Sequence, residues 1–142
     1  MTNQHHLNIL LQGVDVWNTW RQQHPEVQPD LSATNLTFLK MRKADFTRTD
    51  FSGSDLSYTE FDESDFSNAD LTDTKFLDAE LQMANFSSAN LRRASFLVAN
   101  LRGALFSKAL FSATDFLGAS IDATNFDNID LDELELNDSM IK

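Results

Sequence analysis

The chain has 142 residues, enough for one domain, and carries 22 acidic against 11 basic side chains, a formal net charge of −11. Nucleic acids and anionic membranes are therefore poor default partners, since both favour clusters of Lys and Arg. No apolar run approaches the roughly 18 residues that span a bilayer and no secretory signal opens the chain, so we expect a cytoplasmic protein that does not bind membranes.

The first predicted element is an amphipathic helix over residues 7–17. Its apolar residues follow the spacing i, i+3, i+4, i+7, i+10 and are Leu7, Leu10, Leu11, Val14 and Trp17. The helix is predicted to end before Pro25. Such a stripe needs an apolar surface to cover.

A repeat of five residues begins at residue 31. Every fifth residue from there is large and apolar, and all 23 positions of the series are Leu, Phe, Ile or Met. With 42% hydrophobic residues in the chain, chance gives such a series a probability on the order of 10⁻⁹. The residue two places earlier is Ala, Ser or Thr in 18 of the 19 units from Thr34 to Thr124, and the residue just before the large one is usually Asp, Asn or Glu.

A period of five fits neither a helix, which repeats every 3.6 residues, nor a strand, which repeats every 2. It fits a coil in which each unit forms one side of a square and the large and small residues both point inward. Four units make a lap of twenty residues, and laps stack through parallel hydrogen bonds about 4.8 Å apart. Residues 30–142 then supply about 5.6 coils, and one interior ladder is all aromatic: Phe46, Phe66, Phe86, Phe106 and Phe126.

Several units resemble the A(D/N)LXX motif of the pentapeptide repeat family, namely Ala69-Asp70-Leu71, Ala84-Asn85-Phe86, Ala89-Asn90-Leu91 and Ala99-Asn100-Leu101. The resemblance covers residues 30–142 and implies an all-β solenoid, a right-handed quadrilateral parallel β-helix. The departures from the family pattern are Leu39, Leu105, Leu110, Ile129 and Leu134. The leader of cyanobacterial members of the family is similar to two further segments, Trp17-Asn18-Thr19-Trp20-Arg21 and Pro29-Asp30-Leu31-Ser32.

The chain is therefore expected to divide into an N-terminal α-helical cap, residues 1–29, and a pentapeptide-repeat β-helix, residues 30–142. Both ends of such a rod expose backbone edges that invite association unless they are covered. The helix is expected to cover the first coil. The C-terminal end has no comparable helix, so it either caps itself or meets a second copy, which predicts a monomer or an end-to-end homodimer through the C-terminal coil.

Side chains suited to catalysis or to binding a cofactor or metal are scarce. The chain has no cysteine, and its three histidines precede the repeat, so no serine of the rod has a histidine base. His5 and His6 are interpreted as a solvated terminus rather than a metal site. The carboxylates of a crowded acidic cluster are interpreted as a solvated face: Glu60, Asp62, Glu63 and Asp65. We predict no catalytic residue, no cofactor and no metal.

Charge is banded along the repeat. Residues 45–80 carry a net charge of −9, residues 81–114 a net charge of +4 and residues 115–138 a net charge of −8. The favoured interpretation is an acidic surface that keeps the rod soluble. The alternative is an anionic rod that imitates DNA for a basic partner, although the basic middle band interrupts the imitation.

One outward feature is an apolar strip. Three of its leucines are twenty residues apart, just after the inward residue on one side of each lap, and the other members lie one position further on. The strip consists of Phe38, Tyr58, Leu77, Leu97, Val98 and Leu117. Lys75, Asp78 and Asp115 flank it, and Leu105 and Leu110 add a smaller apolar spot beside the basic band. Contiguous exposed apolar surface often marks an interface. The alternatives are that the N-terminal segment packs over the strip, or that the exposed apolar residues are tolerated without a function.

The favoured function is a non-enzymatic rigid scaffold that presents the apolar strip to an unknown protein partner. Its stacked coils would lose little entropy on docking. The alternative is a DNA-mimic regulator of a topoisomerase, because some members of the family that the chain resembles bind gyrase and protect it against quinolones. Those members are longer rods that pair through a C-terminal helix, which this sequence does not predict. An enzyme is the least favoured reading.

Overall fold

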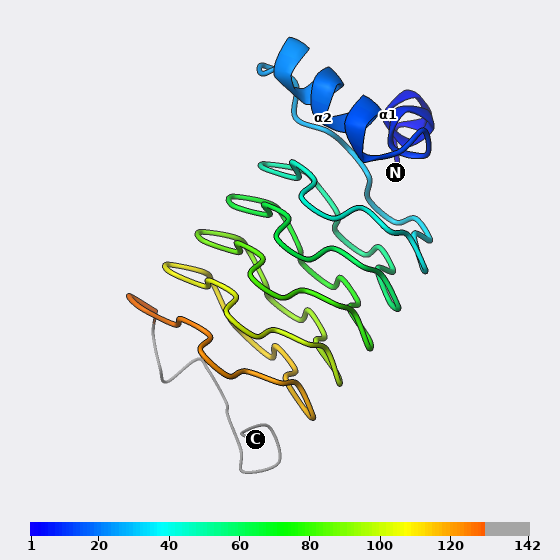
Figure 1. Ribbon diagram of the computed structural model, residues 1–142. Coiled ribbons are helices and arrows are strands. Elements are labelled where there is room, and N and C mark those ends of the chain that lie inside the picture. The colour runs from blue at the N-terminus through cyan, green and yellow to red at the C-terminus, as the bar shows by residue number, and fades with distance from the viewer. Residues whose placement is uncertain (130–142) are drawn as a thin grey trace.

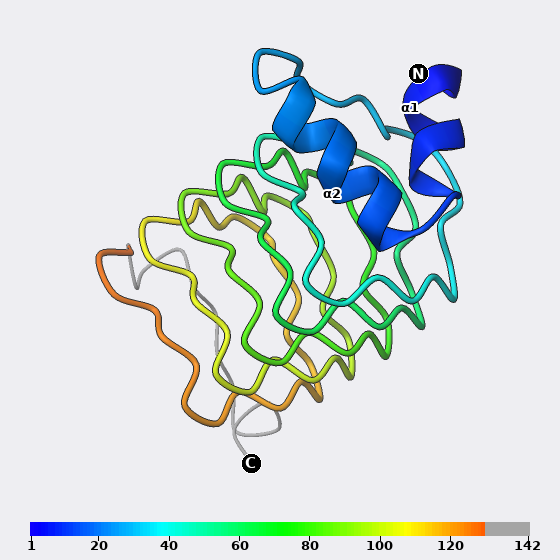
Figure 2. The same cartoon turned by 45° about the horizontal axis from the view of Figure 1, so that its top comes forward.

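The computed structural model describes residues 1–129, with two short helices followed by a stack of coils. Helix α1 spans Gln4–Leu10 and helix α2 spans Val14–Gln23. Both helices lie over the first coil, at one end of the stack (Figures 1 and 2). Neither helix is long and apolar enough to cross a membrane.

The coils are joined by parallel bridges between residues twenty apart. These bridges run from Asp30 and Asp50 at one end to Leu105 and Asn125 at the other. Within residues 1–129 they are isolated bridges rather than extended strands, because each side of a lap holds only one five-residue unit. The predicted pairing of position i with position i+20 is confirmed.

Each unit changes direction at a tight turn after its large apolar residue. The second residue after the large one has a positive φ, as Tyr58 at 60° and Val98 at 59° illustrate. A backbone hydrogen bond closes most of these turns, for example from the N–H of Ser54 to the carbonyl of Phe51 (2.9 Å). The large residue is the first of the four residues of the turn. A turn in which only the third of the four has a positive φ is a type II turn.

The Asp and Asn residues before the large positions support these turns from outside. Their side-chain oxygens accept a hydrogen bond from the N–H two residues later, as in Asp50 with Ser52 (2.9 Å) and Asn85 with Ser87 (2.9 Å). These are Asx turns, in which a side chain replaces a backbone acceptor. The repeat therefore keeps Asp and Asn for a local structural reason.

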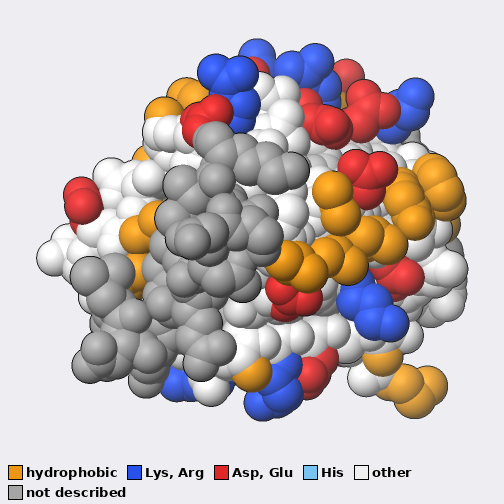
Figure 3. Space-filling view, turned by 90° about the horizontal axis from the view of Figure 1, so that it is seen from below, with side chains coloured by type: hydrophobic (Ala, Val, Ile, Leu, Met, Phe, Trp, Pro, Cys, Tyr) orange, Lys and Arg blue, Asp and Glu red, His pale blue; other side chains and the backbone are white. Residues whose placement is uncertain are grey.

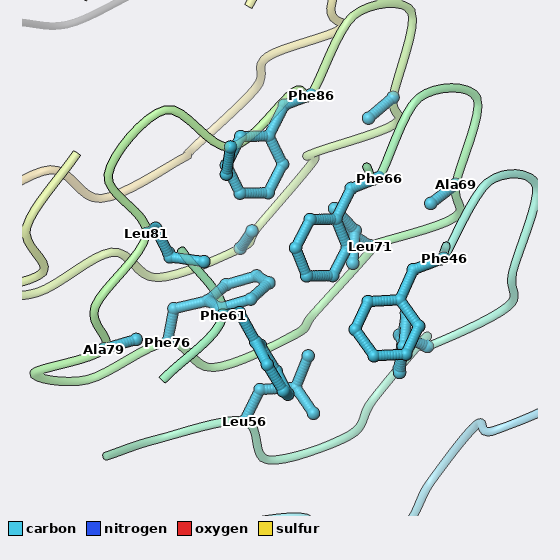
Figure 4. Packing of buried hydrophobic residues seen from close by; sticks show 14 of the residues in the cluster. Phe46, Leu56, Phe61, Phe66, Ala69, Leu71, Phe76, Ala79, Leu81 and Phe86 are labelled. Atoms are coloured by element: carbon cyan, nitrogen blue, oxygen red, sulfur yellow. The ribbon is translucent and has the colours of Figure 1, made fainter. Parts of the chain in front are cut away.

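The interior is filled by the large residues, with phenylalanine rings in vertical stacks (Figure 4). Phe66 and Phe86 are nearly parallel, with ring centroids 5.0 Å apart and 8° between planes. Phe76 and Phe96 form a second stack with 4.9 Å and 6°. Between the stacks the rings meet edge to face, as Phe86 and Phe96 do at 80°. Both arrangements are favourable for aromatic pairs, and the predicted aromatic ladder is confirmed.

Buried hydroxyls at the small positions connect one coil to the previous one. Ser54 Oγ donates to the carbonyl of Leu31 (2.6 Å), and Thr74 Oγ1 donates to the carbonyl of Phe51 (2.9 Å). Both hydroxyls are almost fully buried, so these bonds offset the cost of removing them from water. Ser and Thr can therefore replace Ala inside the rod.

The prediction of one continuous N-terminal helix is wrong. Helix α1 ends at Leu10, and Gly13 has a φ of +107°, which a right-handed helix does not allow. As a result Leu11, which the stripe placed inward, is 58% exposed, whereas Leu10 and Trp17 are buried. The apolar stripe belongs to two helices that meet at an angle.

The cap covers the first coil with side-chain hydrogen bonds as well as apolar contacts. Trp17 Nε1 donates to the carbonyl of Asp45 (2.7 Å), and Asn18 accepts from the N–H of Asp45 (2.8 Å) while donating to the carbonyl of Lys43 (2.9 Å). Arg21 donates to the carbonyl of Thr47 (2.7 Å). These groups take the place of a preceding coil, so the expected cap over the first coil is present.

His6 also belongs to this cap, which corrects its interpretation as part of a solvated terminus. Its side chain is buried, and its Nδ1 accepts a hydrogen bond from the N–H of Asp30 (3.0 Å). Its ring lies 5.1 Å from that of Trp20. His5 is exposed, as expected.

The predictions made for the C-terminal end lie outside the described residues. They concern the self-capping or pairing of the last coil and the interior positions Leu131, Leu136 and Ile141.

Candidate protein-interaction surface

The apolar strip lies on one side of the rod, and each of five successive coils contributes to it. Phe38 is 67% exposed, Tyr58 43%, Val98 51% and Leu117 44%, while Leu77 and Leu97 are partly exposed. An elongated band of hydrophobic side chains of this kind is visible in Figure 3. The N-terminal segment leaves these side chains open, so packing beneath it does not explain the strip.

Two aromatic rings stack on each other at the N-terminal end of the strip. The rings of Phe38 and Tyr58 stack with centroids 5.0 Å apart and 12° between their planes. Both residues occupy the positive-φ position of their turns, as does Val98. That backbone conformation is uncommon for bulky and β-branched residues, yet three members of the strip adopt it.

A groove of about 410 Å³ lies in the middle of the strip. Tyr58, Leu77 and Leu97 give it an apolar lining, and Asp55 and Lys75 provide charged groups at its side. The small side chains of Ser57 and Ser95 also line it. A hollow lined by apolar groups with a few polar ones is typical of a binding surface.

Charge pairs elsewhere on the rod join residues twenty apart. Arg93 binds Asp73 through two hydrogen bonds of 2.9 Å, and these bonds hold the pKa of Asp73 below its usual value. Lys40 lies 3.4 Å from Glu60. The pair with Lys40 offsets part of the repulsion between Glu60 and Glu80, which are bridge partners in successive coils.

The interpretation of the acidic cluster as a fully solvated face is wrong at Asp62. This side chain is buried, and its Oδ1 accepts a hydrogen bond from the N–H of Gln82 in the next coil (2.8 Å). Its other oxygen lies 3.8 Å from Nε of Arg42. Asp62 thus serves to join coils.

The second apolar spot marks two interrupted Asx turns. Leu105 is 41% exposed and Leu110 is 43% exposed, in places where most units have Asp or Asn. A leucine side chain has no oxygen that can accept a hydrogen bond from the backbone N–H two residues later. The turn after Leu110 also lacks the hydrogen bond that closes most of the others, from the N–H of Thr114 to the carbonyl of Phe111.

A further groove lies beside the helices, and the sequence did not indicate it. It has a volume of about 420 Å³ and is lined by Ile9, Val16 and Trp20 together with polar residues of α2. The break at Gly13 is the only signal that could have suggested it, because the groove depends on the angle between α1 and α2. No cluster of three or more metal-ligating side chains occurs in residues 1–129.

A family model for pentapeptide repeats matches the chain in eight copies, over residues 30–68, 64–96 and 99–133. Together with the coil of twenty residues per lap, this match shows that the chain belongs to the pentapeptide repeat family. Proteins of this kind form right-handed β-helices and generally act as structural or interaction modules. No curated protein matches the chain significantly.

Solved structures support the same fold. A pentapeptide repeat protein from the thylakoid lumen of Arabidopsis thaliana is 23% identical with a TM-score of 0.67, over 75% of this chain and 71% of that one. Rfr23, from the cyanobacterium Cyanothece 51142, is 18% identical with a TM-score of 0.64, over 80% and 92% of the two chains. A trypsin-treated variant of QnrB1, a plasmid-mediated fluoroquinolone resistance protein, is 16% identical with a TM-score of 0.53, over 80% and 86%.

Proposed function

We propose that this protein is a non-enzymatic scaffold that docks a partner protein on the apolar strip. The observation that carries the proposal is an exposed apolar surface continuous across five coils, which includes Phe38 at 67% exposure. Isolated exposed apolar residues are common, but a contiguous strip with a groove at its centre is typical of an interface. The proposal includes the division into a helical cap, residues 1–29, and a quadrilateral β-helix of about 5.6 coils, residues 30–142, and a cytoplasmic location.

The rigidity of the strip supports docking. The backbone beneath it is fixed by hydrogen bonds between coils, such as that from the N–H of Tyr58 to the carbonyl of Leu77 (2.8 Å). A surface that is ordered before it binds loses little conformational entropy on association. The repeat therefore provides the position and the order of the apolar side chains.

Affinity capture from cell extract with quantitative mass spectrometry tests the proposal. We compare the natural protein with Leu97→Asp and Leu117→Asp, and with Leu105→Asp as a control that makes the same change at a similarly exposed leucine on another side. A partner retained by the natural protein and Leu105→Asp, and lost by both strip variants, is expected. Identical protein profiles for all four would count against the strip, provided that circular dichroism shows every variant to be folded.

The second candidate is a DNA-mimic regulator of gyrase. Its support is a ladder of stacked carboxylates, Asp30, Asp50 and Asp70, which Asn90 and then Leu110 interrupt. A gyrase supercoiling assay separates the two functions. We expect no effect of the protein at micromolar concentration, and inhibition or protection against a quinolone would instead favour this candidate.

A further inference from the structure

We propose that the element bound by the apolar strip is an amphipathic α-helix that carries Lys or Arg beside its apolar face. This inference rests on the proposed docking function and specifies the partner.

The backbone of the strip is not free to pair with an added strand. The N–H groups of Phe38, Tyr58 and Val98 donate to the carbonyls of Ser57, Leu77 and Leu117 at 3.1, 2.8 and 2.9 Å. A peptide that binds by strand addition needs unpaired N–H and C=O groups along an edge. The partner must therefore be held by its side chains.

The spacing of the strip matches a helix better than an extended chain. One coil rises about 4.8 Å, so the four steps from Phe38 to Leu117 cover about 19 Å. A helix rises 5.4 Å per turn and covers that distance with about 13 residues. Side chains on one face of a strand recur every 6.6–6.8 Å and would fall out of step after two coils. Apolar residues at i, i+4, i+7 and i+11 of a helix would meet successive coils.

The groove supplies an anchor point for such a helix. It lies between Tyr58, Leu77 and Leu97, and its volume of about 410 Å³ accommodates a large apolar side chain with part of its neighbours. Central anchors in apolar hollows contribute most of the binding energy in protein interfaces. A leucine or larger residue in the middle of the partner helix would occupy it.

The charges beside the strip favour a basic partner. In the described part of the chain, Asp55, Asp78 and Asp115 lie on the same side of the laps as the strip, and Lys75 is the one base there. Among residues 1–129, none of these three carboxylates takes part in an ion pair. Figure 3 shows acidic side chains on both sides of a hydrophobic band, with basic side chains beside it on one side. A second copy of this chain, with a net charge of −11, is a poorer occupant because like charges would face each other.

The test uses fluorescently labelled helical peptides of 15 residues and the full-length protein, with binding followed by fluorescence anisotropy. The first peptide has Leu at positions 2, 6, 9 and 13 with Lys beside them. The second has Glu in place of each Lys. The third has the composition of the first, with its leucines spread around the helix.

We expect the first peptide to bind saturably, and at least tenfold more tightly than either of the others. Leu117→Asp and Leu97→Asp should each weaken its binding at least tenfold, although both changes add negative charge and would strengthen a purely electrostatic attraction. Leu105→Asp should leave the affinity unchanged. Raising the salt concentration should weaken binding, because exposed charges are then screened.

The inference would be overturned if the first peptide bound no more tightly than the second or the third. It would also be overturned if Leu105→Asp weakened binding of the first peptide as much as the strip variants do. If the first peptide does not bind but the strip variants still lose a captured protein, the docking function stands and the helical partner is wrong. If the variants change neither peptide binding nor capture, the docking function itself is wrong.

Discussion

At the scale of single residues, the turn imposes a left-handed backbone on side chains of every kind. Among residues 1–129, seventeen residues other than glycine have a positive φ, and Ser88 at 59° is one of them. This conformation costs an L-residue roughly 1–2 kcal/mol, which the surrounding hydrogen bonds offset. The sequence did not reveal these positions, because their residue types vary from aromatic to acidic.

Replacing Ser88 by glycine should therefore stabilise the protein. We expect Ser88→Gly to raise the free energy of unfolding by about 0.5–1 kcal/mol, since relief of the positive φ exceeds the entropy that glycine loses on folding. The neighbouring Ser87 has no positive φ, so Ser87→Gly should lower the free energy of unfolding by about 0.5–1 kcal/mol. Urea unfolding of both variants measures the two values, and shifts of the same sign would contradict this explanation.

The Asx turns make a second prediction, at Leu110. Leu110→Asn restores the acceptor that other units have, and should raise the free energy of unfolding by about 1 kcal/mol, the net value of a typical hydrogen bond. Leu117→Asn makes the same change at a leucine of similar exposure, 44% against 43%, but at a position that does not support a turn. The control should show no gain. A midpoint of urea unfolding that does not move for Leu110→Asn would be the contrary result.

At the scale of elements, the repeat was predictable and the cap only in part. The five-residue period reports inward and outward positions directly, so Phe46 and Phe66 could be placed in one ladder. Trp17 could be placed on the apolar face of a helix. The hydrogen bond from Trp17 to the carbonyl of Asp45 could not be predicted. It depends on how the helix packs on the edge of the first coil, 28 residues later in the chain.

His6 makes the attachment of the cap dependent on pH. Its Nδ1 must be unprotonated to accept from the N–H of Asp30. Burial lowers its pKa below the usual 6.5, the nearby His5 and Arg21 lower it further, and Asp30 opposes them. The unfolded chain therefore binds a proton at a higher pH than the folded one, so stability is full above about pH 6.5 and decreases as the pH falls below it.

The variant His6→Asn tests this dependence. Its side-chain oxygen can accept the same N–H without titrating, so the loss of thermal stability between pH 7.5 and 5.5 should be smaller than in the natural protein. His5 and His24 are present in both proteins and cancel in the comparison. An identical loss for the two proteins would show that His6 is not responsible.

At the scale of the whole molecule, stability is carried by stacks that run along the rod. Phe86 lies between Phe66 and Phe106 at 5.0 and 4.9 Å and meets Phe76 and Phe96 edge to face. Each coil contacts only its neighbours, as in other repeat proteins. Loss of a central ring would therefore interrupt the contact between the two halves of the core. The same geometry carries the apolar strip along the outside.

Phe86→Ala should accordingly lower the free energy of unfolding by about 3–5 kcal/mol. The same substitution at Phe38, which is 67% exposed, should cost less than about 1 kcal/mol. Urea unfolding followed by circular dichroism compares the two. Equal effects would mean that the aromatic stack does not carry the core.

The six residues of the strip could be grouped from sequence once the lap was known, because positions twenty apart become neighbours. Their exposure follows from the same count, since Leu77 and Leu97 come directly after inward residues. The groove between them could not be predicted, because it depends on how the side chains of Tyr58, Leu77 and Leu97 are arranged on successive coils.

The lap of twenty residues is tested most directly by engineered disulfides, since the chain has no cysteine of its own. Ser87 and Ser107 are twenty apart, and the N–H of Ser88 bonds the carbonyl of Ser107 at 2.9 Å. Ser87→Cys with Ser107→Cys should form an intramolecular disulfide readily under mild oxidation, and Ser87→Cys with Ser112→Cys should not, because the second pair lies on different sides of the rod. Thiol titration and mass spectrometry measure both. Equal cross-linking of the two pairs, or preferential cross-linking of the second, would contradict the winding on which the core, the strip and the proposed partner all depend.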